Sequence, residues 1–275
     1  MINLAITFPS DGSSRSVRDT IVKGTVMHSR GSETGVVVNG ILANIYGTEF
    51  VANHIPLVEG SNTITATATD VDGNMETVSI TVNGVNQGNY IRITSNSESG
   101  LSPLEAILTL ESSLDLTNAS LTYAGPAEVE FLSANASEYR VRMITEGIYY
   151  FTANLTDLSG NLYSDTVAIT VLSEAYLDGL LRGKWEAMRA KLTGGDIEGA
   201  LVSFDESKKQ DYRGLFNVLS TMLPTVVQEM SDIELIEYVG NAAIYDIQTT
   251  RNGITYSFQL LFTKDSNGIW RISSF

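Results

Sequence analysis

The chain has 275 residues, 43% of them hydrophobic, and a formal net charge of −15. This length suits two or three domains, and the hydrophobic content excludes a generally disordered chain. The acidity argues against a nucleic-acid partner, because phosphate binding needs clustered Lys and Arg, and the absence of cysteine excludes disulfides and thiolate metal sites.

No membrane span is expected, since no stretch approaches the roughly 18 apolar residues that one needs. No signal peptide is expected either, because Met1 leads directly into the strand-like run LAITF. We therefore expect the chain to be part of a longer polypeptide.

Residues 1–86 are predicted to form a sandwich of short strands. The expected strands are apolar or alternating runs between turn residues: Leu4–Phe8, Thr20–Met27, Gly35–Val38, Ile41–Tyr46 and Gly60–Thr69. Asn39 and Gly40 give a strong hairpin signal, because both residue types tolerate positive φ.

One turn sequence occurs twice in the chain. Thr65–Asn74 reads TATATDVDGN, and Thr152–Asn161 reads TANLTDLSGN. Each copy follows an alternating run and precedes a second one, Val78–Val82 or Val167–Val171. A repeat of paired strands about a fixed turn indicates two small all-β domains in tandem.

Both β segments resemble immunoglobulin-like families. Through VVVNGILA, LVEGSNTITATATDVDGN and VSITV, residues 1–86 resemble the bacterial immunoglobulin-like domains of surface proteins and secreted polysaccharide hydrolases. Through SGLSPLEAILTL, EGIYYFTANLTDLSGN and TVAITV, residues 87–173 resemble polycystic-kidney-disease-type domains. That family's Trp-Asp-Phe-Gly-Asp-Gly run is replaced here by LTYAGPAEVEFL, so we expect the fold to survive with Tyr123 in the core Trp position, and we carry no function over from the missing motif.

The hydrophobic period changes from two to about 3.6 near residue 174. Ala175–Leu192 is predicted to form an amphipathic helix, Asp196 to cap a short second helix, and Pro224 to kink or restart a third helix that begins near Ser207. Four strands should follow, joined in part by turns at Asn252–Gly253 and Asn267–Gly268: Ile233–Val239, Ala242–Thr249, Ile254–Phe262 and Ile269–Ser274.

Helices followed by an antiparallel sheet predict an α+β domain over residues 174–275. The sequence segments GDIEGAL, NAAIYDI and FTKDSNGIWRISSF resemble the nuclear-transport-factor-2-like group. In that group a curved sheet wraps around helices to make a cone. The resemblance implies that a Tyr and acidic residues inside the cone do proton transfer in catalytic relatives. The ligand-pocket candidates are Tyr212, Tyr245, Asp246, Tyr256 and Trp270, and no residue is assigned as catalytic.

Three aspartates are candidates for calcium: Asp70, Asp72 and Asp157. An EF-hand loop needs Glu at its twelfth position, which Thr81 occupies here, so a hairpin turn held by the Asp side chain is the favoured interpretation. No other metal and no cofactor are predicted. The two histidines, His28 and His54, lack a triad or zinc pattern and are interpreted as ordinary polar positions.

Two further groups of residues could act on or bind carbohydrate, but each also has a purely structural interpretation. Glu128 and Glu130 are interpreted as a solvated strand face rather than a glycosidase pair. Tyr123, Tyr149, Tyr150 and Phe151 are candidates for a sugar-stacking platform. The last three alternate faces on one strand, so one face must be core, and core packing is the favoured interpretation.

The leading functional hypothesis is a non-enzymatic module of a bacterial extracellular or cell-envelope protein. In it the sandwiches are spacers that present an interaction domain to a surface polysaccharide or a protein. One alternative is a small-ligand receptor or enzyme that uses the C-terminal cone. A second alternative is a filament or surface-assembly subunit that pairs exposed strand edges.

Overall fold

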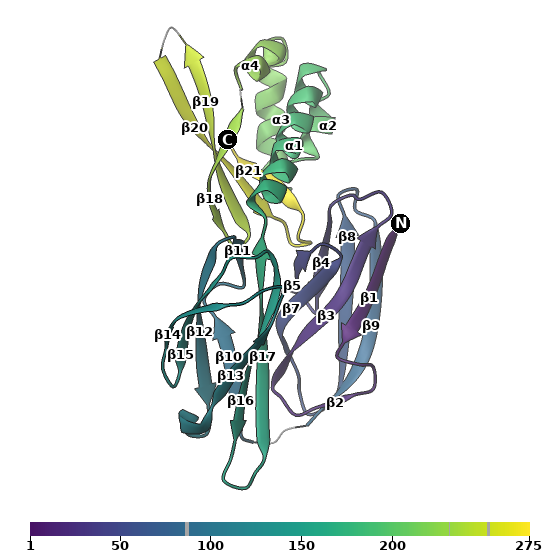
Figure 1. Cartoon of the computed structure of the whole chain (residues 1–275). Helices are drawn as coiled ribbons and strands as arrows, with labels where there is room; N and C mark the ends of the chain where they lie inside the picture. The colour runs from purple at the N-terminus through teal and green to yellow at the C-terminus, as the bar shows by residue number, and fades with distance from the viewer. Residues whose placement is uncertain (86–87, 231, 252–253) are drawn as a thin grey trace. The chain divides into compact units, whose positions relative to one another are not determined.

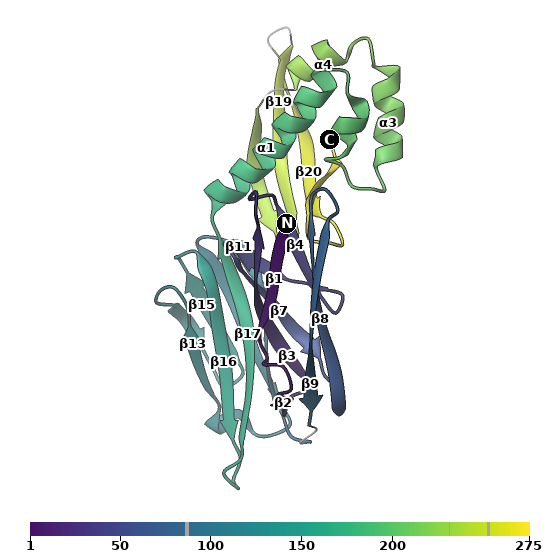
Figure 2. The same cartoon turned by 90° about the vertical axis from the view of Figure 1, so that its right-hand side faces the viewer.

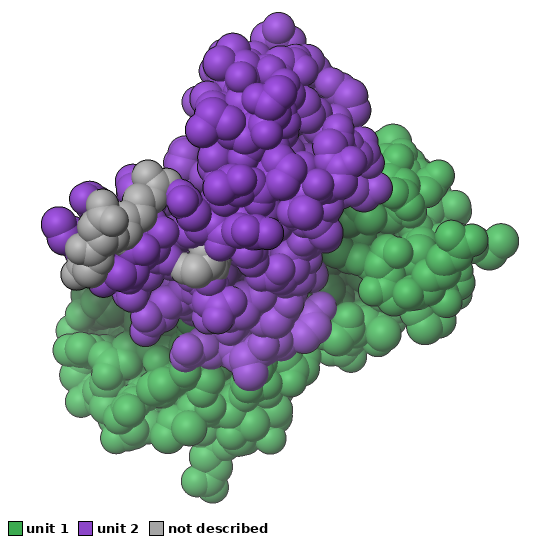
Figure 3. Space-filling view, turned by 90° about the horizontal axis from the view of Figure 1, so that it is seen from above, with its two compact units in different colours: residues 1–173, 266–269 green, residues 174–265, 270–275 purple. Residues whose placement is uncertain are grey.

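The computed structural model describes residues 1–85, 88–230, 232–251 and 254–275. The chain is mostly β and forms two compact units, residues 1–173 with 266–269 and residues 174–265 with 270–275 (Figure 3). The predicted turn at Asn252–Gly253 and residues 86 and 87 of the first predicted domain joint lie outside the described residues.

The first sandwich packs a four-stranded and a five-stranded sheet around one core (Figure 1). One sheet has the order β1 (Ile2–Phe8), β3 (Asp19–His28), β7 (Glu49–Pro56), β6 (Asn44–Tyr46). The other has the order β2 (Ser14–Arg15), β9 (Met75–Gly84), β8 (Gly60–Asp70), β4 (Thr34–Val38), β5 (Ile41–Leu42). Val22, Phe50 and Ile55 meet Val36 and Ile64 between them.

The Asn39–Gly40 hairpin forms as predicted, with φ of 46° and 85° at its two positions. The predicted single strand Ile41–Tyr46 is two strands in the structure. Its first part pairs with β4 in one sheet and its second part pairs with β7 in the other, so the chain changes sheets at Ala43. The segment 41–46 therefore contributes an edge strand to each of the two sheets.

The second sandwich has two four-stranded sheets. The first has the order β10 (Ile91–Ser95), β12 (Leu104–Ser112), β15 (Glu138–Met143), β14 (Glu130–Ala134). The second has the order β11 (Ser99–Leu101), β17 (Leu162–Leu172), β16 (Gly147–Thr156), β13 (Ser120–Ala124), and a short 3-10 helix spans Leu116–Asn118.

The core position proposed for Tyr123 is wrong. Its side chain is 38% exposed, because β13 lies at the edge of its sheet. Tyr149 and Phe151 fill the core instead and are fully buried. Each lies on β16 with its side chain on the inner face, while Tyr150 lies on the outer face, as the strand alternation requires.

The second unit has the predicted order of helices and then an antiparallel sheet. Four helices come first: α1 (Glu174–Thr193), α2 (Ile197–Leu201), α3 (Lys209–Val218) and α4 (Leu223–Glu229). The sheet has the order β18 (Ile233–Val239), β19 (Ala242–Arg251), β20 (Ile254–Lys264), β21 (Trp270–Ser274). Figures 1 and 2 show the helices gathered on one face of this sheet.

Local signals explain where these helices end and begin. Gly195 has a φ of 75° after α1, and the Asp196 carboxylate accepts the amide of Gly199 at 2.9 Å to cap α2. Pro224 lies in the first turn of α4, so the predicted third helix restarts there. Among the described residues, no helix combines the length and the apolar content that a bilayer crossing requires.

Candidate functional site

A β-bulge in β7 organises the junction between the two sandwiches of the first unit. In the β3–β7 pair, Val22 is opposite Ala52 and Thr20 is opposite Ile55, so Asn53 and His54 together face one residue of β3. His54 has a φ of 53°, a left-handed conformation that is uncommon outside glycine. Such a bulge redirects the side chains of its strand. Here Asn53 contacts Ala168 of the second sandwich, and His54 contacts Asp19 of β3.

Asn53 docks the first sandwich onto the second. Its amide nitrogen donates to the Ala168 carbonyl and its amide oxygen accepts from the Ala168 N–H, both at 2.9 Å. Asn53 is 4% exposed and Ala168 is fully buried, so these bonds are shielded from water. The Asn53 side chain therefore continues the hydrogen-bond ladder of β17 beyond its own sheet.

Apolar contacts surround this bond. Ile21 and Val51 of the first sandwich cluster with Ile148 and Ala168 of the second, and Phe8 and Tyr150 pack against them. The ammonium of Lys23 lies 4.7 Å from the centre of the Tyr150 ring. The outer face of Tyr149–Phe151 is thus covered by the neighbouring sandwich, and Tyr150 is no open sugar platform.

A charged cluster lies beside this contact. The Nδ1 atom of His54 lies 3.0 Å from Asp19 Oδ1, and the Nε atom of Arg92 lies 3.5 Å from Asp19 Oδ2. Asp165 accepts the Ile93 amide at 2.9 Å. The outer nitrogen of His54, Nε2, and the Nε atom of Arg92 are buried without a hydrogen-bond partner among the described residues.

Burial sets the protonation of this cluster. It raises the pKa of Asp165 to about 6, because the ionised carboxylate loses water at the junction. The pKa of His54 is also raised, chiefly by its hydrogen bond to Asp19. Burial lowers the pKa of Arg15, although the nearby Asp165 charge opposes that shift.

The cluster resembles a metal site in composition only. Asp19, His54 and Asp165 each offer one ligand atom within 4.8 Å of the others. Two guanidinium groups, those of Arg92 and Arg15, already supply positive charge to these carboxylates, and a divalent cation would be repelled by both. We therefore interpret the cluster as a charge network.

A cleft of about 520 Å³ lies next to this network. Its walls come from the β2–β3 segment, the β7–β8 connection, the end of β9, the start of the second sandwich and β17. They carry aromatic rings, guanidinium groups and carboxylates. The guanidinium carbon of Arg18 lies 4.1 Å from the centre of the Tyr90 ring. The polar residues that line the cleft are Ser16, Arg18, Asp19, Glu59, Asn89, Tyr90, Arg92, Glu111, Tyr163, Ser164 and Asp165.

The sequence analysis missed this site because its residues are far apart in the chain. Asp19, His54, Arg92 and Asp165 come from four different strands, and no local motif joins them. The one usable sequence signal was the continuous apolar run Phe50–Ala52, which is typical of a strand that is covered on both faces.

The calcium candidates form two copies of one turn. Asp70 accepts the backbone amides of Asp72 and Asn74 at 3.0 and 2.9 Å, and Asp157 accepts those of Ser159 and Asn161 at 2.9 Å each. In both copies an Asn side chain also donates to the carboxylate. These bonds occupy the acceptor sites that a cation would use, which supports the turn interpretation.

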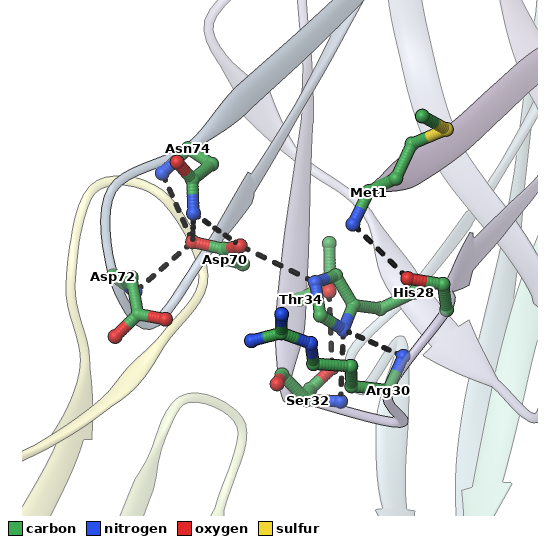
Figure 4. A network of polar contacts seen from close by, with 9 residues as sticks. Met1, His28, Arg30, Ser32, Thr34, Asp70, Asp72 and Asn74 are labelled. Atoms are coloured by element: carbon green, nitrogen blue, oxygen red, sulfur yellow. Dashed lines mark hydrogen bonds and ion pairs between the residues drawn. The ribbon is translucent and has the colours of Figure 1, made fainter.

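His28 adds a contact that only the first copy has (Figure 4). Its Nε2 atom lies 3.4 Å from Asp70 Oδ2, while its Nδ1 atom accepts the amides of Arg30 and Ser32. The imidazole thus ties the loop after β3 to the turn between β8 and β9.

The five pocket candidates of the second unit differ in their burial and in their hydrogen-bond partners. The Tyr212 hydroxyl donates to the Phe275 carbonyl and accepts its amide, which is a structural role. Tyr245 is fully buried, and burial together with the neighbouring Asp178 carboxylate raises its pKa. Asp246 lies on the opposite face of β19, where Gln248 and Ser257 donate to it. Tyr256 is 44% exposed, and Trp270 is buried.

The interior between α1 and the sheet holds bulky side chains. Trp185, Tyr245 and Phe262 are all less than 2% exposed. Phe258 of β20, by contrast, is 52% exposed. The structure therefore brings Tyr245 next to α1 without gathering the other four candidates around it.

Glu128 and Glu130 are both exposed, and Glu130 lies 4.0 Å from Arg142. Only Glu130 belongs to a strand. The pair faces solvent, as the solvated-face interpretation requires.

Residues 2–87 match the family model for domain B of glucodextranase. The match covers the first sandwich alone and supports an immunoglobulin-like β-sandwich there. No curated protein matches the chain.

Parts of this chain match solved structures at low sequence identity and low TM-score. The fibronectin(III)-like modules of Clostridium thermocellum CbhA are 14% identical over 63% of this chain and 96% of that one, with a TM-score of 0.25. Protocadherin gamma B2 extracellular cadherin domains 3–6 are 15% identical over 62% of this chain and 47% of that one, with a TM-score of 0.25.

The Bacteroides ovatus mixed-linkage glucan utilisation protein SGBP-B, solved with a heptasaccharide, is 14% identical over 61% of this chain and 47% of that one, with a TM-score of 0.21. The chain thus spans about half the length of the cadherin and SGBP-B chains. Likenesses at these TM-scores carry no argument about function.

Proposed function

We propose that this chain is a non-catalytic, carbohydrate-related spacer module of a larger extracellular or cell-envelope protein. The observation that carries the proposal is the docking of the tandem sandwiches through the buried Asn53–Ala168 pair. A spacer must hold its domains in a fixed relation, and a paired, water-shielded amide does so with more directional specificity than apolar contact alone.

The family match supports the carbohydrate part of the proposal. Domain B of glucodextranase is a non-catalytic immunoglobulin-like domain of an enzyme named for a glucan. A polysaccharide near this chain would then be the substrate or the anchor of a neighbouring domain. The bacterial origin, the polycystic-kidney-disease-type second sandwich and the nuclear-transport-factor-2-like C-terminal domain are parts of the proposal that rest on sequence resemblance.

Hydrogen exchange in the full chain tests the spacer role. We expect the Ala168 amide, which donates to Asn53, to exchange as slowly as the core amides of β16 and β17. In Asn53→Ala the same amide should lose more protection than the core amides of β16 and β17 lose. Fast exchange of Ala168 in the unaltered chain would show that the sandwiches separate freely and would contradict the proposal.

A further inference from the structure

The cleft beside the sandwich junction offers both donors and acceptors on facing walls. Arg18 and Asp19 come from the first sandwich, Arg92 and Glu111 come from the second, and Asn89 precedes the second. The backbone of Tyr90 is held on both sides, since its amide donates to Ser113 and its carbonyl accepts from Ser112. The Tyr90 ring lines the cleft and is held there by the Arg18 guanidinium, whose carbon lies 4.1 Å from the ring centre.

The chemistry of these walls excludes several ligand classes. An apolar ligand would strip water from two guanidinium groups and several carboxylates without replacing their hydrogen bonds. A small anion would meet Glu59 and Glu111 at the exposed rim, and a cation would meet Arg18 and Arg92. The ligand that matches mixed charges is neutral and carries groups that both donate and accept.

We infer that this cleft binds a neutral saccharide chain. Hydroxyl groups can donate to Asp19 and Glu111 and accept from the guanidinium groups of Arg18 and Arg92, all of which line the cleft. The Arg18 guanidinium lies over one face of the Tyr90 ring, so the C–H face of a pyranose ring can pack on the outer face of the guanidinium that Tyr90 supports. A volume of about 520 Å³ lies within the usual range of ligand pockets.

This inference rests on the proposed function for its carbohydrate context, but it needs the cleft rather than the docking itself. The probes are isomaltoheptaose, maltoheptaose, cellohexaose and soluble mixed-linkage β-glucan, each titrated into the full chain by calorimetry. We expect saturable binding of at least one probe. Tyr90→Ala should weaken that binding at least tenfold, and Glu111→Gln should weaken it severalfold.

Two matched variants control for general effects. Tyr46→Ala removes a partly exposed tyrosine of β6 and Glu130→Gln neutralises an exposed carboxylate of β14, both outside the cleft. Each should leave the Kd within twofold. Equal thermal midpoints for all variants would show that they remain folded.

Absence of binding for all four probes, or binding that survives Tyr90→Ala, would overturn the saccharide site. Slow Ala168 exchange in the same chain would leave the spacer role standing in that case. Fast Ala168 exchange together with Tyr90-dependent binding would keep the site and reject the spacer.

Discussion

Asn53 decides the docking of the sandwiches because it satisfies two backbone groups of a different domain. Truncation to Ala leaves the Ala168 N–H and C=O buried and unpaired, and each such group costs about 1–3 kcal/mol. We expect Asn53→Ala to lower the free energy of unfolding of the first unit by about 2–5 kcal/mol, measured by urea denaturation. Asn3→Ala, at an exposed site of β1, should change it by less than about 0.5 kcal/mol.

Asp165 gives the first unit a pH dependence of defined sign. Its folded-state pKa of about 6 lies above the ordinary value, so the folded state holds more protons than the unfolded state between about pH 4 and 6. Its contribution to stability is complete below the unfolded pKa and is lost as the pH rises through 6. The raised pKa of His54 acts in the same direction at higher pH.

Asp165→Asn should therefore stabilise the unit at pH 7. The gain should reach at most about 3 kcal/mol, from about 1.4 kcal/mol per pKa unit, and should vanish near pH 4. Urea midpoints from pH 4 to 8 measure it, with the exposed Asp72→Asn as the control. Parallel pH profiles for Asp165→Asn and the unaltered chain would show that Asp165 carries no such penalty.

Asp70 and Asp157 should act through turn geometry rather than through calcium. Millimolar calcium or a chelator should leave the thermal midpoint unchanged, whereas Asp70→Ala should lower it, since two backbone amides lose their acceptor. A midpoint that rises with calcium and no longer does so in Asp70→Ala would revive the metal interpretation.

At the scale of elements, the β7 bulge is the feature that makes the junction. His54 needs a left-handed backbone, which costs roughly 1–2 kcal/mol for a residue with a Cβ atom and more for a branched one. We expect His54→Gly to be more stable than His54→Val by about 1–3 kcal/mol in urea denaturation. Equal stabilities would mean that the bulge relaxes when the imidazole is removed.

Elements with local signals were predictable from the sequence. The Asn39–Gly40 hairpin, the Asp196 cap, the restart at Pro224 and the four C-terminal strands follow from turn chemistry and hydrophobic period. β7 was not predicted, because burial on both faces removes the alternation that marks a half-buried strand. The edge position of Tyr123 also depends on sheet order, which no local pattern contains.

The candidate site was harder to predict than the elements. The cleft and the charge network are made by contacts between residues such as Asp19 and Arg92 or Asn53 and Ala168, which only the docking brings together. The repeated turn, which was the strongest sequence signal, is structural in both copies. Sequence pattern therefore predicted strands and helices better than it predicted the contacts between residues far apart in the chain.

In the whole molecule, we expect the two sandwiches of the first unit to move as one rigid body, because the Asn53–Ala168 bonds and the apolar contacts beside them join the two. The net charge of −15 disfavours self-association, because like-charged copies repel one another. The cleft differs from this acidic background because both arginines and carboxylates line it. The absence of cysteine also makes the chain suitable for site-directed spin labelling.

The most direct test is the distance between labels on Ser79→Cys in β9 and Ser133→Cys in β14, measured in the full chain by pulsed electron paramagnetic resonance. We predict one narrow distance distribution, which broadens when Asn53→Ala is added and stays narrow with Asn3→Ala. A broad distribution in the chain with native Asn53 would contradict the rigid docking on which the account depends.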